Sequence, residues 1–487
     1  MDFNKKKIRS DHYIKRQETA RKTLSWIFSK IKSHFIIFAI IISGLLVTYT
    51  VAAKVIDTVS TLSVKNILLS IVSSPLKEDE FGHTNFLMLG IGGGDHDGAE
   101  LTDSIIVASL DEKNNLIPML SIPRDFYVKD EEIGSDRINR YYELKKMIYE
   151  ENGYQESEAQ TLALEDTSIK IGEILGIEIQ YYALINFDGF TEVVDAMDGI
   201  DIYLDESFYD NQYPIGETGF YETFSLPAGE NHLDGDMALK YARSRKTTSD
   251  FDRGLRQQTI LNAIKEKALS AGILTSPSKI KDLYDAISDN FVTNLSISEM
   301  AYLGEIADGF GEDSMLSQVL NDNPEQAGGF LYTPPREDYG GAFVLVPSSD
   351  DYSEIQLFAN LFFYNTQIYQ ENIPLQIVNS SKYEGLATDT LIYLTRYGLN
   401  VVRYGNAPRI GEAETTIFDL GTTPNLESET VNAIKQLIPT AITQTVVPED
   451  YSPINWESEA EILIELGSNF IPFYEENYEK RFYYWVQ

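Results

Sequence analysis

The chain has 487 residues, of which 43% are hydrophobic and 12% aromatic, a formal net charge of -36 and no cysteine. This length and hydrophobic content indicate folded material with sizeable cores, in more than one domain. The absence of cysteine excludes disulfides, thiolate metal sites and cysteine nucleophiles. The surplus of carboxylates argues against nucleic acid as a partner, because nucleic-acid binding needs a basic surface.

The N-terminal end differs from the rest of the chain. Residues 1–33 carry ten Lys and Arg against three Asp and Glu, and residues 35–53 carry no charge. As a helix, this uncharged run would reach about 28 Å, near the hydrocarbon thickness of a bilayer. We therefore expect a basic cytoplasmic segment (1–33), a transmembrane anchor (34–54) in the cell membrane and an extracytoplasmic remainder. A signal peptide cleaved after Ala52 and Ala53 is the alternative, which the long basic lead disfavours.

After a juxtamembrane stalk (55–80), strands and helices alternate. Strands are expected at 85–91, on both sides of a turn at 112–115, and at 179–187. Helical spacing covers 141–175, with Gly176 as its stop, and 188–200. This mixture predicts an α/β (α+β) catalytic domain over 81–350, with a mixed sheet flanked by helices.

Another helix is expected just after residue 248. Thr248, Ser249 or Asp250 can cap its N-terminus. Its buried stripe should consist of four apolar residues at helical spacing. These are Leu255, Leu261, Ile264 and Ala268.

A second unit follows a stretch rich in Pro, Gly and Asp at 321–351. Residues 351–371 are expected to be a linker, and residues 372–470 again alternate strands and helices, which predicts a smaller α/β domain. The end of the chain (471–487) forms an aromatic tail. Either it packs against the last domain, or it contacts a partner or glycan.

Several familiar sites are excluded by their spacing. The loop "GIGGGDHDG" lacks the third glycine of a dinucleotide fingerprint at Asp95 and leads into a strand rather than a helix. "DHDG" is too short for a calcium loop, no H-E-x-x-H motif indicates zinc, and no G-x-S-x-G elbow is present.

Positive charge concentrates in "YARSRKTTSDFDRGLRQQ" (241–258), where four arginines flank one helix start. Carboxylates gather in and after the glycine-rich loop. Guanidiniums clamp phosphate oxygens, carboxylates hold a hard divalent cation, and a helix N-terminus adds backbone donors. Together they predict a site for a pyrophosphate carrying magnesium, and phosphoryl transfer needs little more. The alternative is a solvated helix face, with Arg253 and Arg256 in surface pairs with Asp250 and Asp252.

In their order and spacing, "NFLMLGI", "TDSIIVASL", "LSIPRDFYV", "LDGDMALKYARSR" and "DFDRGLRQQ" resemble the LytR-CpsA-Psr family of wall-polymer ligases over roughly residues 85–267. "IVNSSKYEGLATDTLIYLTRYGLNVVRYGNAPR" resembles the LytR C-terminal domain, placed at 372–470. The resemblance implies a phosphotransferase that moves a glycopolymer from a polyprenyl-pyrophosphate lipid to a hydroxyl of peptidoglycan. It also implies Mg²⁺ as cofactor and an apolar groove for the lipid.

The resemblance also assigns roles to residues of this chain. Those implied to grip phosphate are Arg124, Arg243 and Arg245. Those implied to shape the same pocket are Asp250, Arg253, Arg256 and Gln257. Asp103 is the implied metal ligand.

Two departures from the family pattern concern this site. Leu101 replaces a phosphate-facing arginine, and Gly92 stands where a second metal carboxylate is usual. We expect Asp95 or Asp97 to supply that carboxylate. The general base is open among Asp103, Asp125 and a magnesium-bound hydroxide.

Two other functions remain as alternatives. One is a hydrolase of lipid pyrophosphates, with water in place of the sugar hydroxyl. The other is a non-catalytic surface protein that binds cell-wall glycan, which the departures at Leu101 and Gly92 favour.

Overall fold

The computed structural model describes most of the chain after residue 74. The described ranges are 75–94, 98–215, 220–244, 250–270, 289–296, 314–349, 351–421, 425–451 and 459–479, with residues 299, 302, 303, 306 and 310. The predicted cytoplasmic segment and transmembrane anchor lie outside these ranges, as does most of the stalk. Within the described ranges, no helix has the length and hydropathy needed to cross a bilayer.

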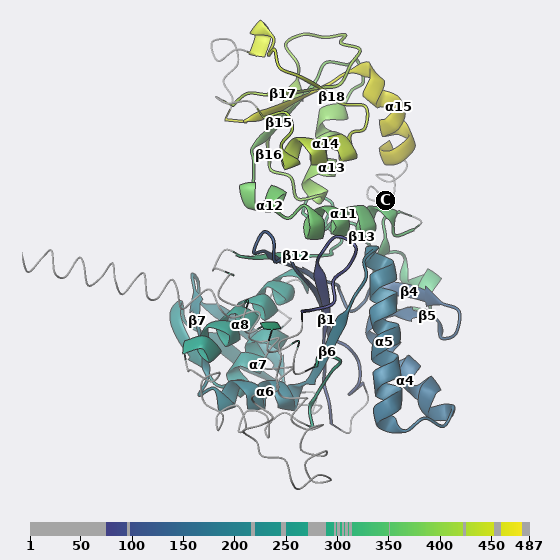
Figure 1. The fold of residues 1–487 in the computed structure, drawn as a ribbon, viewed down its shortest axis with the longest axis vertical. Helices are drawn as coiled ribbons and strands as arrows, with labels where there is room; N and C mark the ends of the chain where they lie inside the picture. Colours follow the sequence, from purple (N-terminus) through teal and green to yellow (C-terminus); the bar gives the residue numbers. More distant parts are fainter. Residues whose placement is uncertain are drawn as a thin grey trace, which may run out of the picture.

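A six-stranded mixed sheet forms the centre of the first unit (Figure 1). Its spatial order is β11-β6-β1-β2-β3-β12. The strands are β1 (Thr84–Ile91), β2 (Ser104–Leu110), β3 (Ile117–Ser121), β6 (Tyr181–Asn186), β11 (Phe291–Thr293) and β12 (Met315–Val319). The sheet is mixed because β1 is antiparallel to β2 but parallel to β6. The expected α/β architecture is confirmed for this unit.

Helices cover both faces of this sheet. One face carries α4 (Tyr141–Glu151) and α5 (Glu156–Leu175), and the other carries α6 (Phe187–Ala196), α7 (Gly235–Arg243) and α8 (Asp250–Ser270) (Figure 1). Side chains of β1 alternate accordingly, since Leu87 packs in the core under α5 and Phe86 in the core under α7 and α8.

The single helix expected over 141–175 is two helices. They are separated at Asn152–Gln155, where Gly153 has a φ of 91°. Glycine adopts this conformation without a Cβ penalty, so the chain can reverse there and α4 packs against α5. Gly176 ends α5 with a φ of 68°, as expected.

Smaller elements surround the main sheet. β4 (Tyr127–Asp130) pairs with β5 (Gly134–Arg137), β7 (Ile200–Leu204) with β10 (Gly229–Leu233), and β8 (Phe208–Pro214) with β9 (Tyr221–Leu226). β13 (Leu331–Tyr332) pairs with β14 (Val346–Pro347), and short 3-10 turns lie at η1 (Ile138–Arg140) and η5 (Arg336–Tyr339). Strand β10 was not expected, because only its pairing with β7 makes it a strand.

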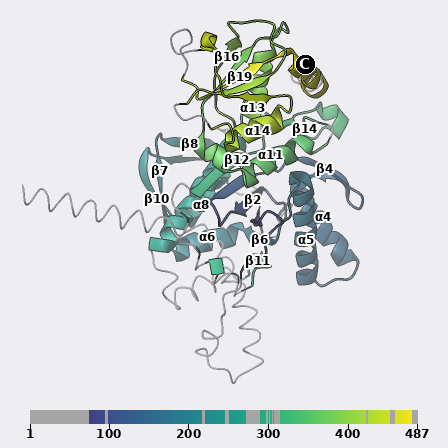
Figure 2. The same ribbon diagram turned by 45° about the horizontal axis from the view of Figure 1, so that its top comes forward.

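A five-stranded sheet in the order β16-β15-β19-β17-β18 forms the second unit (Figure 2). Its strands are β15 (Leu375–Asn379), β16 (Val401–Asn406), β17 (Thr416–Asp419), β18 (Ile442–Gln444) and β19 (Ile462–Leu466). Its helices are α13 (Leu386–Arg396), α14 (Glu429–Leu437) and α15 (Ile471–Tyr474), with short turns η6 (Glu449–Tyr451), η7 (Ser468–Phe470) and η8 (Glu475–Glu479). The start of the aromatic tail packs on this unit, since Tyr474 is 5% exposed and contacts Tyr383.

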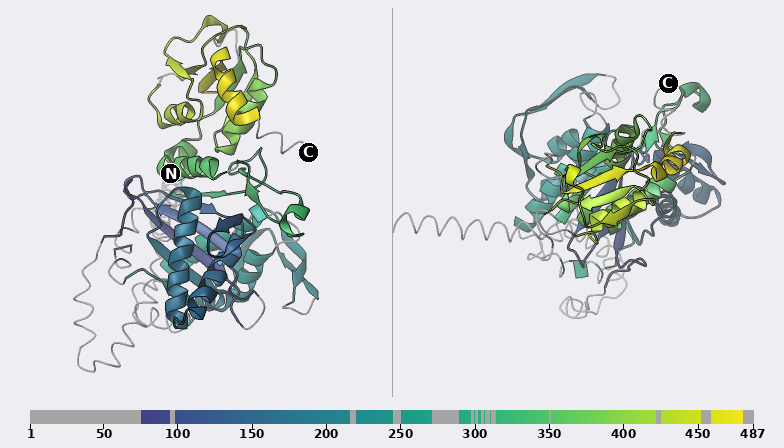
Figure 3. Two further views of the ribbon diagram at one scale, coloured as in Figure 1. Left: turned by 90° about the vertical axis from the view of Figure 1, so that its right-hand side faces the viewer. Right: turned by 90° about the horizontal axis from the view of Figure 1, so that it is seen from above.

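The expected linker (351–371) is instead two helices, α11 (Ser353–Tyr364) and α12 (Gln367–Glu371). Phe358 and Phe362 of α11 are fully buried, one helical turn apart. α11 lies between the two units (Figure 3). One continuous hydrophobic core therefore joins both units through residues that a flexible linker would leave in solvent.

Arg396 of α13 ties the units together. It is 1% exposed, donates from Nε to the Gly329 carbonyl at 2.8 Å and from Nη2 to Ser348 Oγ at 2.7 Å. Its Nη2 also lies 3.4 Å from a carboxylate oxygen of Glu354, which is itself 3% exposed. The guanidinium is therefore surrounded by partners at the junction.

Candidate active site

Three adjoining cavities lie where β1 ends, β2 begins and α8 starts. The first, which we call the polar cavity, measures about 370 Å³, and the second, the arginine cavity, about 330 Å³. These two share Asp103, Ser104, Arg253 and Gln257. The third, the apolar cavity, measures about 140 Å³ and lies between β1, β2, α6, α7 and α8.

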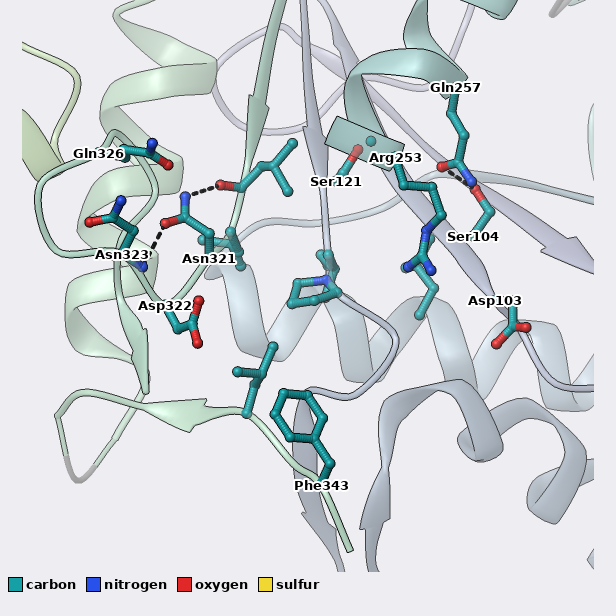
Figure 4. Close-up of a pocket in the computed structure, with 17 residues that line it drawn as sticks. Asp103, Ser104, Ser121, Arg253, Gln257, Asn321, Asp322, Asn323, Gln326 and Phe343 are labelled. Atoms are coloured by element: carbon teal, nitrogen blue, oxygen red, sulfur yellow. Dashed lines mark hydrogen bonds between the residues drawn. The ribbon is translucent and has the colours of Figure 1, made fainter. Parts of the chain in front are cut away.

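A close contact fixes the start of α8 against the sheet. A Cβ added to Gly254 would lie 3.0 Å from Val319 Cγ2 of β12, so only glycine fits here without a shift. Arg253 and Gln257, one helical turn apart, therefore both line the polar cavity (Figure 4). Gln257 Oε1 accepts a hydrogen bond from Ser104 Oγ at 3.1 Å, which connects α8 to β2.

The buried face of α8 differs from the expected stripe. Leu255 is 40% exposed, whereas Arg253 and Arg256 are only 8% and 6% exposed. Ile264 is buried as expected, and the Ala268 side chain lies outside the described part. The alternative of a solvated arginine face is therefore wrong for both of these arginines.

Arg256 holds two helices together. Its Nε donates to the Tyr241 carbonyl at 3.1 Å, Nη2 donates to the Ser244 carbonyl, and its guanidinium carbon lies 5.3 Å from the centre of the Phe208 ring. These bonds join the end of α7 to α8. Arg256 does not line any of the three cavities, so within the described residues its contribution to the site is through the position of α7.

Arg243 closes α7 and lies between two cavities. It lines both the arginine and the apolar cavities, with its guanidinium carbon 4.1 Å from the centre of the Phe187 ring. Burial raises the pKa of the nearby Tyr213 hydroxyl above its ordinary value of 10.0, although the Arg243 charge opposes this. Tyr213, which also lines the arginine cavity, therefore stays neutral at physiological pH.

Asp103 is held by a network of ion pairs. Its Oδ1 accepts from Arg124 Nη1 at 2.9 Å and from Asn139 Nδ2 at 3.3 Å. Asp125 is 5% exposed and lies 3.5 Å from Arg124 Nε and 3.1 Å from Arg137 Nη1. Arg124 and Asp125 do not line the three cavities. In this geometry Asp125 holds Arg124, and Arg124 orients Asp103, whose side chain is 40% exposed and lines the polar and arginine cavities.

The structure describes one of the three predicted metal ligands, Asp103. Asp95, Asp97 and Arg245 lie outside the described residues, and Asp250 is described only by its backbone, as the first residue of α8. Over the described residues, no group of three His, Asp or Glu side chains is arranged to hold a metal ion. Asp103 alone remains as a described carboxylate with access to both cavities, and Mg²⁺ typically takes one or two carboxylates together with substrate phosphates.

Several cavity residues were missed by the sequence analysis. Of these residues, only Ser104 could have been predicted, because it follows Asp103, a candidate metal ligand, in the sequence. Asp210 and Tyr213 of β8, and the loop at 321–326 after β12, also line the cavities. No motif marks them, because only the tertiary fold brings them to α8.

Comparison with known proteins places the chain in a family. The LytR_cpsA_psr family model matches residues 43–341, more than half of the chain. The cell wall biosynthesis protein LcpA of Corynebacterium glutamicum is 25% identical over 367 residues, 69% of this chain and 66% of that protein. The polyisoprenyl-teichoic acid–peptidoglycan teichoic acid transferase TagV of Bacillus subtilis is 32% identical over 243 residues, 49% of this chain and 54% of that protein.

These alignments leave part of each relative uncovered: the chain spans about two thirds of LcpA and about half of TagV. The crystal structure of B. subtilis TagV is 26% identical, with 57% of this chain and 96% of that chain covered and a TM-score of 0.41. The family match ends before the second unit, so the assignment of residues 372–470 as a LytR C-terminal domain stays a prediction. By its match over residues 43–341, the chain belongs to the LytR-CpsA-Psr family.

Proposed function

We propose that this protein is a membrane-anchored, extracytoplasmic phosphotransferase that joins a lipid-carried glycopolymer to peptidoglycan. The observation that carries the proposal is the arginine cavity, where Arg243 and Arg253 lie beside an apolar cavity with which it shares Arg243 and Gln257. A polyprenyl-pyrophosphate donor needs this combination of cations beside an apolar surface. The relatives named as teichoic acid transferases support the same chemistry.

The described residues suggest how transfer would proceed. Arg243 and Arg253 would neutralise the pyrophosphate and hold it in line with the acceptor hydroxyl. The acceptor oxygen forms a bond to the phosphorus that carries the sugar, the bond from that phosphorus to the bridging oxygen breaks, and polyprenyl phosphate leaves with the electron pair. The hydroxyl proton passes to a base. Asp103 is the candidate base that both cavities reach, whereas Asp125 is occupied by two arginines.

Magnesium remains part of the proposal. A carboxylate would hold it together with phosphate oxygens, and the ion would supply charge neutralisation to the leaving phosphate. Asp103 cannot serve fully as both a metal ligand and a base, so one of the two roles falls to another group. Asp95 or Asp97, outside the described residues, is our candidate for the metal ligand.

Reconstitution of the full-length protein in lipid vesicles tests the function. The assay supplies a polyprenyl-pyrophosphate oligosaccharide and peptidoglycan fragments, and mass spectrometry detects products. A phosphodiester-linked conjugate that forms only with acceptor present is the expected result. Free sugar phosphate formed without acceptor would indicate the hydrolase instead, and bound but unchanged lipid would indicate a non-catalytic glycan-binding protein.

A further inference from the structure

One wall of the polar cavity comes from the loop at 321–326, which follows β12. Figure 4 shows Asp322, Asn323 and Gln326 of this loop on the side of the cavity opposite Arg253. Reacting groups are held in place by the walls of a site, so the distance between opposite walls matters to the rate. Whatever fixes this loop therefore also fixes the geometry around Arg253.

The loop closes on itself through backbone contacts. Asn321 donates from Nδ2 to the carbonyls of Val319 and Ala327, at 2.9 and 2.8 Å, and its Oδ1 accepts from the Asn323 amide at 2.9 Å. The Asn321 amide donates to the Gly328 carbonyl at 2.8 Å. The backbone packs so closely there that a Cβ on Gly328 would lie 2.2 Å from the Val319 carbonyl oxygen. Contacts that hold Gly328 therefore hold the whole loop.

The second unit supplies those contacts. The Gly328 amide donates to the Arg396 carbonyl at 2.9 Å, and Arg396 Nε donates to the Gly329 carbonyl at 2.8 Å. The guanidinium carbon of Arg396 lies 4.6 Å from the centre of the Phe330 ring, which in turn lies 4.9 Å from the centre of the Tyr397 ring. The end of α13 therefore contacts three consecutive residues that follow the loop.

Arg396 can act on the polar cavity only through these contacts. Among the described residues, it does not belong to the lining of any of the three cavities. Its guanidinium is fixed from other sides by Ser348 at 2.7 Å and by Glu354 at 3.4 Å, so its bond to Gly329 has a rigid origin. The family match ends at residue 341, so Arg396, Ser348 and Glu354 all lie in a part of the chain beyond it.

On the basis of the proposed function, we propose that the second unit is a functional part of the transferase site. It fixes the wall of the polar cavity opposite Arg253, and Arg396 is the positioning residue through which it does so. Misplacement of a reacting group by about 1 Å can cost about 100-fold in rate. A loop released from α13 should therefore slow transfer even while both units stay folded.

The test separates the position of the loop from the stability of the second unit. Arg396→Met combined with Glu354→Gln removes the bond to Gly329 without leaving a buried carboxylate unpaired. Arg409→Met combined with Glu465→Gln is the matched control, because Arg409 Nε donates at 2.8 Å to Glu465, which is 1% exposed, within the second unit. Each double variant removes one pair of an arginine and a buried carboxylate, but only the first pair bonds to the residue after the loop.

A spin label on the loop reports its mobility. The chain has no cysteine, so Glu325→Cys creates a single labelling site on an exposed residue that does not line the polar cavity. Measurements use the full-length protein in lipid nanodiscs, well below the melting temperature of each variant. In the Arg396 double variant we expect a more mobile label and a kcat/KM for transfer that is lower by about tenfold or more.

Two quantities should stay constant in this experiment. The Arg409 double variant should keep the wild-type line shape and transfer within about twofold of the wild type. The affinity for polyprenyl pyrophosphate without sugar should be unchanged in both double variants, because Arg243 and Arg253 are held by α7 and α8 and not by the loop.

Three results would overturn the proposal: an unchanged line shape in the Arg396 double variant, a mobile loop with normal transfer, or an equal loss of transfer in the Arg409 double variant. If the Arg396 double variant does not fold, Arg396→Lys replaces it with the same readouts. Lysine keeps the charge beside Glu354, but it cannot donate to both Gly329 and Ser348 in the geometry of the guanidinium.

The same experiment separates this proposal from the proposed function. A wild type that transfers no glycopolymer refutes the proposed function, and with it the role of the second unit in transfer. Normal transfer by both the wild type and the Arg396 double variant refutes the role of the second unit alone.

Discussion

Arg253 offers the sharpest test of the site, because the residue is only 8% exposed and lines both the polar and the arginine cavities. We expect Arg253→Gln, which keeps the length and a hydrogen-bond donor, to lower kcat/KM for transfer by about 10²–10³-fold. Removal of one preorganised transition-state donor costs about 2.7–4 kcal/mol, which corresponds to a loss of this size. Arg253→Lys keeps the charge but loses the planar fork, so an intermediate loss of about tenfold should result.

The assay is single-turnover transfer in reconstituted vesicles, with the melting temperature of each variant as the check on folding. Arg140→Gln is the matched control, since Arg140 pairs with Asp136 at 2.6 Å on a partly exposed surface outside the cavities. Such surface pairs contribute less than about 1 kcal/mol, so transfer should stay within about twofold of the wild type. If Arg253→Gln folds normally and keeps half or more of the wild-type rate, Arg253 does not stabilise the transition state of transfer.

Three further predictions follow from other parts of the structure. Arg396→Met should lower the free energy of unfolding by about 3–5 kcal/mol in urea titrations, because Glu354 is left charged and buried, and adding Glu354→Gln should recover part of the loss. Burial holds the pKa of His83 below its ordinary 6.5 despite the attraction of Asp111. Below pH 6.5 the unfolded chain therefore binds a proton that the folded chain does not; urea midpoints should fall from pH 7 to pH 5, and His83→Gln should make this fall shallower. Asp103→Asn should lower transfer about 100-fold and leave its response to added Mg²⁺ in place, whereas loss of the Mg²⁺ response would make Asp103 the metal ligand instead of the base.

Arg396 also connects the junction of the two units to a loop that lines the polar cavity. It supports Gly329 and Gly328, which position the loop at 321–326 through Asn321.

The arginine run shows what local sequence can and cannot predict. Its charge and a helix start near residues 248–250 could be predicted from the residues themselves, and α8 is described from Asp250 onward. The residues did not show which face of α8 is buried. Leu255 suggests one face, whereas the close approach of Gly254 to Val319 selects another. Arg256 was expected at the phosphate, but the carbonyls of Tyr241 and Ser244, brought near by the packing of α7 against α8, receive its hydrogen bonds.

The sequence by itself determined the elements whose signals are local: the strands at 85–91 and 104–121, the end of α5 at Gly176, the family, and the presence of a cationic cluster. Periodicity and turn chemistry act over a few residues, so they can be read without a fold. Only the tertiary structure decided that residues 351–371 form buried helices and that the loop at 321–326 faces Arg253. Those outcomes depend on packing between segments far apart in the chain, where burial overrides local composition.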